Sequence, residues 1–330
     1  MKRITIKDVA RLSGVSISSV SRYLADPTSI NPSAALSVSK AINELHFIPS
    51  PFARNIKSET ANNIAIILPD ISDHFFSEAC KAICTLFYMY NYSVTICDTD
   101  SVPEKERRYI DEMVKNRSAG IMLVPCGKNT EYIKDVLLHF PRLMLFDRLE
   151  PEIETDMVSE DNERSGYILA RHMLNKGHRR FAILSGSEYS VNMHYRLSGM
   201  KKALSEENVA IEDEFSIINL MNKREAAQAF ENLVQKPDCP RCILAGNIHL
   251  LEGGVIAASR MKLTVPGEYS LAGFTVEDPR YIFPFPVPAV VQNPTELGTR
   301  AGEMMLKRLR NPARNQTPKI HLLNTELVSG

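Results

Sequence analysis

The pattern of apolar and polar positions changes near residue 62. Beyond that point, short apolar runs alternate with longer stretches in which apolar residues recur every three or four positions, as on one face of a helix. The runs predict strands at Ile64–Leu68, Ser93–Cys97, Gly120–Val124, Leu143–Phe146, Phe181–Leu184, Phe215–Ile218, Cys242–Ala245 and Ser270–Gly273. The stretches between them predict helices near Phe75–Tyr90, Pro103–Asn116, Glu131–His139, Arg164–Lys176, Asn192–Glu207, Lys223–Val234, His249–Met261 and Pro294–Leu309. This alternation is typical of α/β domains with doubly wound parallel sheets, and its length favours two such lobes.

The first sixty residues show helical spacing and no strand pattern. Thr5 is placed to cap a first helix, whose expected apolar face is Ile6, Val9, Ala10 and Leu12. A second helix is expected from about Ser16 to Leu24, and a third from about Ser33 to Leu45. On the third helix we expect burial of Leu36, Val38, Ala41, Ile42 and Leu45.

The first two helices have the proportions of a helix-turn-helix, because Gly14 permits a turn with positive φ between them. The expected outer surface of the second helix is Ile17, Ser18, Ser19, Ser21 and Arg22. Serine hydroxyls can approach phosphates closely, and an arginine can donate two hydrogen bonds to guanine. The pattern therefore predicts a DNA-reading module, although it leaves open a three-helix bundle that contacts protein.

The charge distribution agrees with a DNA-reading head. The 330 residues carry no net charge, but residues 1–60 hold eight Lys and Arg against four Asp and Glu, so the head is +4 and the remainder −4.

An apolar content of 44% with 24% charged residues is that of a globular chain and excludes a disordered or coiled-coil one. No run reaches the roughly 18 apolar residues of a membrane span, and no signal peptide is apparent, so we expect a cytoplasmic protein that does not contact membranes.

The six cysteines do not suggest a disulfide framework. Cys239 and Cys242 have the spacing of a redox pair, and Cys80 and Cys84 lie one helical turn apart, but neither pair has the further ligands of a zinc site. We expect structural thiols, no metal and no cofactor. The chain also lacks the nucleotide-binding, nucleophile-elbow and zinc-protease motifs.

Two segments, TIKDVARLSGVSISSVSRYL and INELHFIPSPFARNIK, resemble the N-terminus of the LacI family of bacterial transcription regulators. The resemblance extends over the whole chain. It implies a helix-turn-helix head at residues 1–48, a hinge helix and linker at 49–61, and a two-lobed body at 62–330. In the family this body resembles periplasmic sugar-binding proteins, binds an effector and forms the dimer.

The resemblance also implies which residues meet DNA. Residues matching Ile17, Ser18 and Arg22 face base edges in the major groove. The residues implied to bind phosphates are Thr5, Ser16, Ser19, Ser21, Tyr23 and Asn31. The hinge helix matches Pro49–Lys57 and enters the minor groove, with Arg54 and Lys57 beside phosphates. Ile56 stands where the family usually has a leucine wedge, and isoleucine is the weaker helix former.

Ligands of doubly wound sheets bind beyond the carboxyl ends of the strands. Polar and aromatic residues at those positions lie in the segments 70–76, 125–126, 147–148, 187–196, 247–249 and 275–278. The residues we expect to bind the effector, most of them by resemblance, are Phe75, Phe76, Asp147, Arg148, Asn192, Arg196, Asn247 and Thr275.

Two positions depart from many sugar-responsive members, because Ile248 and Thr275 stand where those proteins have aspartate. The segment NIHLLEGGV looks more like the fructose- and sucrose-responsive repressors. With Arg148, Arg196, His74 and His194 expected near the ligand, the effector is a sugar or a sugar phosphate in this interpretation.

The favoured hypothesis is a dimeric repressor of carbohydrate-utilisation genes that binds a palindromic operator under effector control. The helices that begin near Phe75 and His249 are the expected dimer surface, and the lack of a C-terminal heptad repeat favours a dimer over a tetramer. The alternative is a sugar-converting α/β enzyme with a helical appendage, for which His74 and Asp147 are the available titratable groups. Because no catalytic motif supports the alternative, we expect no enzymatic activity.

Overall fold

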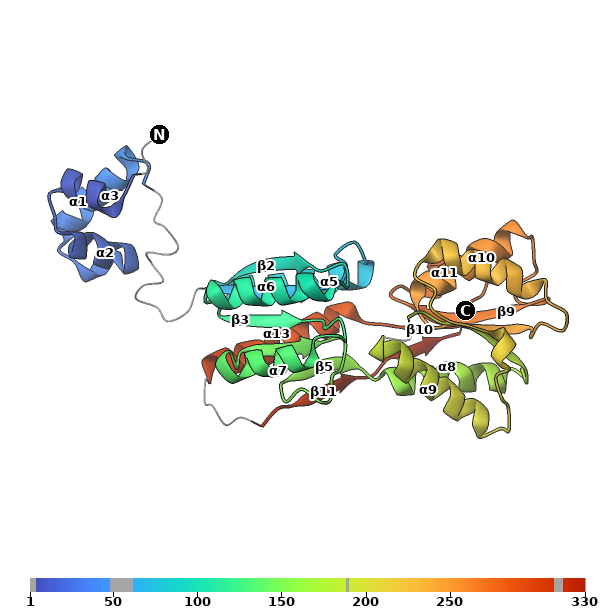
Figure 1. Ribbon diagram of the computed structural model, residues 1–330. Coiled ribbons are helices and arrows are strands. Elements are labelled where there is room, and N and C mark those ends of the chain that lie inside the picture. The colour runs from blue at the N-terminus through green and yellow to red at the C-terminus, as the bar shows by residue number, and fades with distance from the viewer. Residues whose placement is uncertain (1–3, 48–61, 188–189, 312–316, 330) are drawn as a thin grey trace. The chain divides into compact units, whose positions relative to one another are not determined.

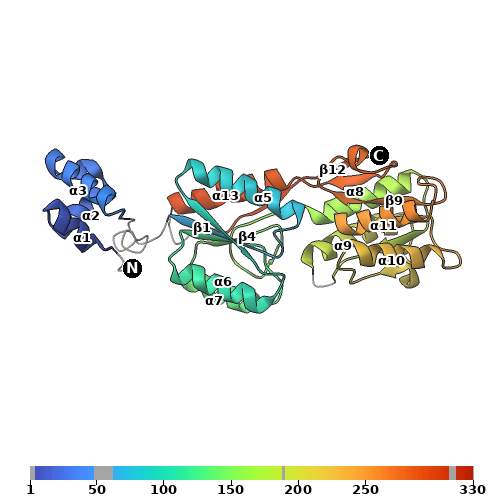
Figure 2. The same cartoon turned by 90° about the horizontal axis from the view of Figure 1, so that it is seen from above.

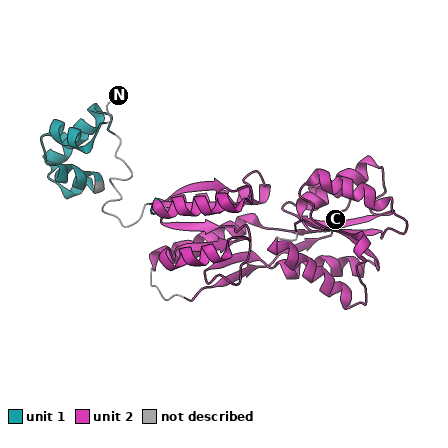
Figure 3. Ribbon diagram, viewed as in Figure 1, with its two compact units in different colours: residues 1–62, 116–118 teal, residues 63–115, 119–330 magenta. Residues whose placement is uncertain are grey.

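The computed structural model describes residues 4–47, 62–187, 190–311 and 317–329. The chain forms two compact units, one of residues 1–62 with the short segment 116–118, and one of residues 63–115 with 119–330 (Figure 3). The expected hinge helix at 49–61, with Arg54, Ile56 and Lys57, lies outside the described residues. Among these residues, no helix has the length and apolar character needed to cross a bilayer.

Residues 4–47 of the first unit form three helices, α1 (Ile6–Ser13), α2 (Ile17–Ala25) and α3 (Pro32–Glu44), with a 3₁₀ turn η1 (Pro27–Ser29) before α3 (Figure 1). Gly14 ends α1 at φ 71°, as the expected turn requires. The core consists of Val9, Ala10, Val20, Val38, Ala41 and Phe47. Two expectations were wrong: Leu12 is 45% exposed and Leu36 is 61% exposed. In a bundle this small, each helix buries only the narrow face that contacts its neighbours. Both leucines lie outside the buried face of their helix.

The N-terminal lobe of the second unit is a six-stranded sheet in the order β11-β5-β4-β3-β1-β2, in which every described pairing is parallel. Its strands are β1 (Asn63–Leu68), β2 (Ser93–Asp98), β3 (Gly120–Leu123), β4 (Leu143–Phe146), β5 (Met157–Glu160) and β11 (Ile320–Leu323). Helices α5 (His74–Met89) and α13 (Pro294–Arg310) cover one face, and α6 (Pro103–Lys115) and α7 (Thr130–His139) cover the other (Figure 2).

The C-terminal lobe is a second six-stranded sheet in the order β12-β10-β9-β8-β6-β7, with only β12 antiparallel among the described pairings. Its strands are β6 (Phe181–Leu184), β7 (Ser216–Ile217), β8 (Cys242–Ala245), β9 (Ser270–Thr275), β10 (Ala289–Val291) and β12 (Glu326–Val328). Helices α8 (Asn162–Asn175) and α9 (Val191–Ser205) pack on one face, and α10 (Lys223–Val234) and α11 (Ile248–Arg260) pack on the other. A 3₁₀ turn η2 (Asp213–Phe215) and a short α12 (Pro279–Ile282) complete the lobe.

The chain passes between the two lobes three times, after β5, after β10, and between β11 and β12. The doubly wound α/β class is therefore confirmed, as are the two lobes and the eight expected helices of the body. The strand expected at Phe215–Ile218 is limited to Ser216–Ile217, because Phe215 closes η2. Strands β5, β10, β11 and β12 were not expected.

Candidate DNA-binding head and inter-lobe polar cluster

Helix α2 presents a polar surface over an apolar base. Val20 is fully buried in the head core, whereas Ile17 is 46% exposed and Ser18 and Arg22 are exposed. Ser16 caps the helix, because its Oγ accepts a hydrogen bond of 3.1 Å from Ser19 N. The side chains implied to read bases therefore extend from one rigid helix, as groove insertion requires.

The implied phosphate contacts include the N-caps of the three helices described in the head. Thr5 precedes α1 and donates from its backbone N to Asp8 Oδ2 over 2.9 Å, and Asn31 precedes α3 and accepts from Ser33 N over 2.9 Å. The N-terminus of a helix carries partial positive charge and free N–H groups, which suit a phosphate. Tyr23, by contrast, packs partly against the head core.

Asp147 follows β4 and is held in an unusual conformation at the edge of the N-terminal lobe. Its φ is 65°, and its carbonyl oxygen accepts a hydrogen bond of 2.5 Å from Ser159 Oγ. The side chain is 5% exposed, and Asn192 Nδ2 of the C-terminal lobe donates to its Oδ1 over 3.1 Å. Burial raises the pKa of Asp147 to about 6, despite the opposing charges of Arg148 and Arg196.

Arg196 lies on α9 and is a buried cation of the C-terminal lobe that feels the charges of Asp147 and Glu160. Its Nε donates to Asn162 Oδ1 over 2.8 Å and its Nη1 donates to the Gly246 carbonyl over 2.9 Å, while the guanidinium carbon lies 4.1 Å from the centre of the Phe274 ring. The side chain is 5% exposed, so burial lowers its pKa, and the nearby charges of Glu160 and Asp147 oppose that effect. Two of its three nitrogens are thus engaged within the protein.

A second pair of contacts lies at the chain crossings, between the end of β5 and the segment that leads from β10 to α13. Gln292 Nε2 donates to Glu160 Oε2 over 2.6 Å, and Asn293 N donates to Glu160 Oε1 over 2.9 Å. Burial raises the pKa of Glu160. Sequence reasoning missed Glu160, Asn162 and Gln292. We call the following set the inter-lobe polar cluster: Asp147, Glu160, Asn162, Asn192, Arg196 and Gln292.

The other expected effector residues have different structural roles. Phe75 and Phe76 are 6% and 7% exposed and belong to the core of the N-terminal lobe. Asn247 caps α11 by accepting from Leu250 N over 2.9 Å. Thr275 at the end of β9 is fully buried.

Arg148 is also fixed from within the protein, since it donates from Nη1 to the Pro125 carbonyl over 3.0 Å. The hydrogen bond from Asn192 to Asp147 and the nearby charge of Arg196 bring these three residues together. They do not place the two phenylalanine rings against this trio.

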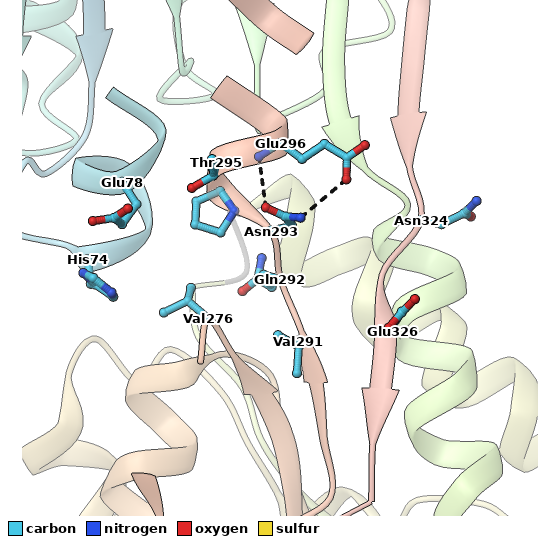
Figure 4. Close-up of a pocket in the computed structure, with 11 residues that line it drawn as sticks. His74, Glu78, Val276, Val291, Gln292, Asn293, Thr295, Glu296, Asn324 and Glu326 are labelled. Atoms are coloured by element: carbon cyan, nitrogen blue, oxygen red, sulfur yellow. Dashed lines mark hydrogen bonds between the residues drawn. The ribbon is translucent and has the colours of Figure 1, made fainter. Parts of the chain in front are cut away.

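A cavity of about 490 Å³ lies at the chain crossings (Figure 4). It is lined by His74, Glu78, Val276, Val291, Gln292, Asn293, Pro294, Thr295, Glu296, Asn324 and Glu326. Three of these side chains are carboxylates and none is lysine or arginine, which disfavours a phosphate there. His74, expected near the ligand, lines this cavity.

The cysteines show no reactive arrangement in the described structure. All six are free thiols, and Cys239 and Cys242 are 8% and 0% exposed. Burial raises the pKa of both, so little thiolate forms at neutral pH. No group of three or more His, Cys, Asp or Glu among the described residues could hold a metal ion.

Comparison with known families places both parts of the chain. Residues 5–50 match the bacterial regulatory proteins of the lacI family, and residues 170–330 match the periplasmic binding protein-like domain. The HTH-type transcriptional repressor PurR of Vibrio vulnificus is 27% identical over 328 residues, covering 98% of this chain and 97% of that protein. PurR of Vibrio campbellii is 28% identical over 311 residues, covering 93% and 92%.

Solved structures share the fold over nearly the whole length. The lac repressor dimer bound to operator and the anti-inducer ONPF has a TM-score of 0.84 at 20% identity, covering 99% of this chain and 98% of that one. A LacI-family regulator from Silicibacter pomeroyi has a TM-score of 0.83 at 24% identity, with the same coverage. The regulator CelR in complex with cellobiose has a TM-score of 0.73 at 18% identity, covering 99% and 100%.

The helix-turn-helix head and the two-lobed body define a bacterial transcription regulator, and these relatives are regulators rather than enzymes. The chain belongs to the LacI family and is a transcriptional repressor. The enzyme alternative is therefore discarded.

Proposed function

We propose that the protein represses transcription by binding a palindromic operator as a homodimer, with an affinity set by a small-molecule effector bound between the lobes. The observation that carries this proposal is the inter-lobe polar cluster, in which Asp147 of one lobe accepts a hydrogen bond from Asn192 of the other. A ligand that inserts at this bond changes the lobe arrangement that is most stable. Linkage then requires operator affinity to change with it.

On the DNA side, α2 reads bases through Ile17, Ser18 and Arg22, and the N-caps Thr5, Ser16 and Asn31 contact phosphates, with Ser19, Ser21 and Tyr23 beside them. The hinge residues Arg54, Ile56 and Lys57 contact the minor groove and its phosphates in this proposal. Support comes from the exposure of α2 and from the match of residues 5–50 to the lacI family.

The proposed effector is a small polar molecule rich in hydrogen-bond donors, a sugar in the first instance. Asn192 Oδ1 is buried without a hydrogen-bond partner among the described residues, and the carboxyl of Asp147 lies beside it. Both groups accept hydrogen bonds, as sugar hydroxyls require. A sugar phosphate is less well supported, because Arg148 and Arg196 already donate within the protein. The cellobiose complex of CelR favours the sugar class.

The proposed dimer surface includes α5 and α11. Apolar side chains on or next to these helices are exposed: Ile71 before α5 at 38% and Ile256 on α11 at 39%. Sedimentation of the wild type and of Ile256→Asp tests this surface. A wild type that sediments as a monomer contradicts the homodimer.

Selection of bound duplexes from a random pool, with and without candidate metabolites, tests the function as a whole. The expected result is enrichment of one palindrome, with an affinity that changes when the effector is added. Calorimetry against free sugars, sugar phosphates and purine bases then assigns the effector class, and binding of neutral sugars alone would end the sugar-phosphate idea. Absence of any enriched sequence at low salt contradicts the proposal.

A further inference from the structure

The N-termini of α5 and α11 meet across the two lobes through Asp73 and His249. Asp73 is the N-cap of α5, and its Oδ1 accepts a hydrogen bond of 2.9 Å from Phe75 N. Its other oxygen, Oδ2, lies 3.2 Å from His249 Nε2 on α11. The two side chains are only 21% and 35% exposed. One carboxylate therefore caps a helix in the N-terminal lobe and binds a residue of the C-terminal lobe.

The imidazole of His249 lies between two carboxylates. Glu252 on the same helix has its Oε2 at 3.9 Å from His249 Nδ1, and Lys223 of α10 binds the same oxygen at 2.6 Å. The hydrogen bond to Asp73 and the nearby carboxylate of Glu252 raise the pKa of His249 to about 9, against the effect of burial. Burial acts to raise the pKa of Asp73, but the hydrogen bonds from His249 and Phe75 N outweigh it, so its pKa is lowered. Both partners are charged at neutral pH.

A neighbouring contact has the opposite polarity and is weaker. His74 Nε2 of α5 lies 3.9 Å from Glu277 Oε1 of the C-terminal lobe, and both side chains are more than half exposed. Exposed ion pairs at such a distance contribute little. The half-buried Asp73–His249 pair is therefore the stronger of these two inter-lobe ion pairs.

We propose that Asp73 and His249 form a latch that holds the two lobes in one arrangement. The effector must shift the protein away from this arrangement when it binds. This inference rests on the proposed effector control. Phe75 lies two residues after Asp73 and Asn247 lies two residues before His249, so each latch residue is close in the chain to a residue that the resemblance implies to bind the effector. Movement of either segment on ligand binding is transmitted to the pair.

The latch holds over a defined pH range. His249 stabilises the closed pair while it is protonated, so its contribution is complete below its ordinary pKa and is lost as the pH rises through about 9. The Asp73 carboxylate stabilises the pair fully at pH values above its ordinary pKa. This stabilisation is lost as the pH falls through the lowered pKa that Asp73 has in the folded protein. The pair is thus intact at neutral pH and opens in alkali.

Three substitutions in the full-length protein isolate the pair. Asp73→Asn removes the charge but retains an N-cap oxygen, since asparagine caps helices as well as aspartate does. His249→Gln removes the cation, and His249→Lys restores a cation that titrates at higher pH. His321→Gln, an exposed residue of β11, is the matched control.

Histidine NMR and a distance between spin labels at the exposed positions 138 and 228, introduced as unnatural amino acids, provide the readouts. We expect the His249 signal to titrate near pH 9 in the wild type and at least one pH unit lower in Asp73→Asn. The inter-lobe distance distribution should broaden in Asp73→Asn and His249→Gln, broaden in the wild type above pH 9, and remain narrow in His249→Lys and His321→Gln.

A wild-type His249 signal that titrates near 6.5, or a distance distribution that neither substitution changes, overturns the latch. These measurements need no DNA. Failure of the wild type to select any DNA sequence would therefore count against the proposed function, and it is distinguishable from failure of the latch.

Discussion

Asp147 and Asn192 lie on different lobes, and the amide nitrogen of Asn192 donates to Asp147 Oδ1 over 3.1 Å. The amide oxygen of Asn192 is buried and has no partner among the described residues. The pair thus combines a bond that a change in lobe arrangement would break with an acceptor that a ligand could satisfy. An effector bound there alters both at once.

Replacing Asp147 with Asn should stabilise the protein at neutral pH. Because burial raises its pKa to about 6, the folded state favours the protonated carboxyl, and stability is lost as the pH rises from about 4 through about 6. Asparagine still accepts from Asn192 without a charge. We expect a gain in unfolding free energy of roughly 1–3 kcal/mol at pH 7 and almost none at pH 4. Urea unfolding at the two pH values measures it.

Asp135→Asn, at an exposed position of α7, is the control. The change that it causes in unfolding free energy should be the same at the two pH values. Loss of stability in Asp147→Asn at pH 7 would mean that attraction to Arg148 and Arg196 exceeds the cost of burial.

Arg196→Met should destabilise the C-terminal lobe strongly. The substitution leaves Asn162 Oδ1 and the Gly246 carbonyl without their donor and removes the cation that faces buried Glu160. We expect a loss of roughly 3–5 kcal/mol in unfolding free energy. Arg171→Met breaks a partly exposed ion pair with Glu207 and should cost less than about 1 kcal/mol. Equal effects of the two substitutions would refute a central role for Arg196.

Gly199→Ala should force α8 and α9 apart. A Cβ at this position would lie 1.9 Å from the Glu163 carbonyl oxygen, a backbone atom that has little room to move. We expect a destabilisation of about 1–3 kcal/mol or more, and a longer bond between Arg196 on α9 and Asn162 on α8. Thermal and urea unfolding provide the measurement.

Gly254→Ala is the matched helical control, because its new Cβ would meet a terminal methyl of Leu271 at 3.3 Å. The methyl can adjust, and alanine favours the helix, so the change should remain within about 1 kcal/mol. If Gly199→Ala is as mild as this control, the close helix crossing is not rigid.

Arg22→Ala should relax sequence recognition at one base pair of the selected operator. The exposed guanidinium on α2 can pair with a guanine, and its loss should cost about 1–3 kcal/mol at that position. Binding to the operator and to single-base variants, at fixed salt, measures the change. An equal loss of affinity on random DNA would show a phosphate contact instead of base reading.

The sequence predicted eight of the twelve described strands and missed β5, β10, β11 and β12. Strands such as Ile64–Leu68 are continuous apolar runs, which a parallel sheet covered on both faces requires. β5 has the sequence MVSE, and β11 and β12 are short segments whose partners lie far away in the chain. Their strand character comes from long-range pairing, so no local pattern reports it.

Some residues of the candidate site could be located from the sequence and others could not. Asp147 and Asn247 follow strands and could be located by position, whereas Glu160 and Gln292 meet only because the lobes do. Asp73 and His249 are 176 positions apart, and each alone looks like an ordinary residue at a helix start. Pairings between lobes depend on the tertiary arrangement, which periodicity does not encode.

The threefold passage of the chain between the lobes has a consequence for synthesis. When residues 1–161 have been synthesised, the first lobe still lacks its edge strand β11 and helix α13. This helix covers one face of the sheet. Both elements follow residue 293 in the chain. The nascent protein must therefore keep an open apolar surface until residues 294–323 have been made, and a premature stop near residue 290 would leave a product prone to aggregation.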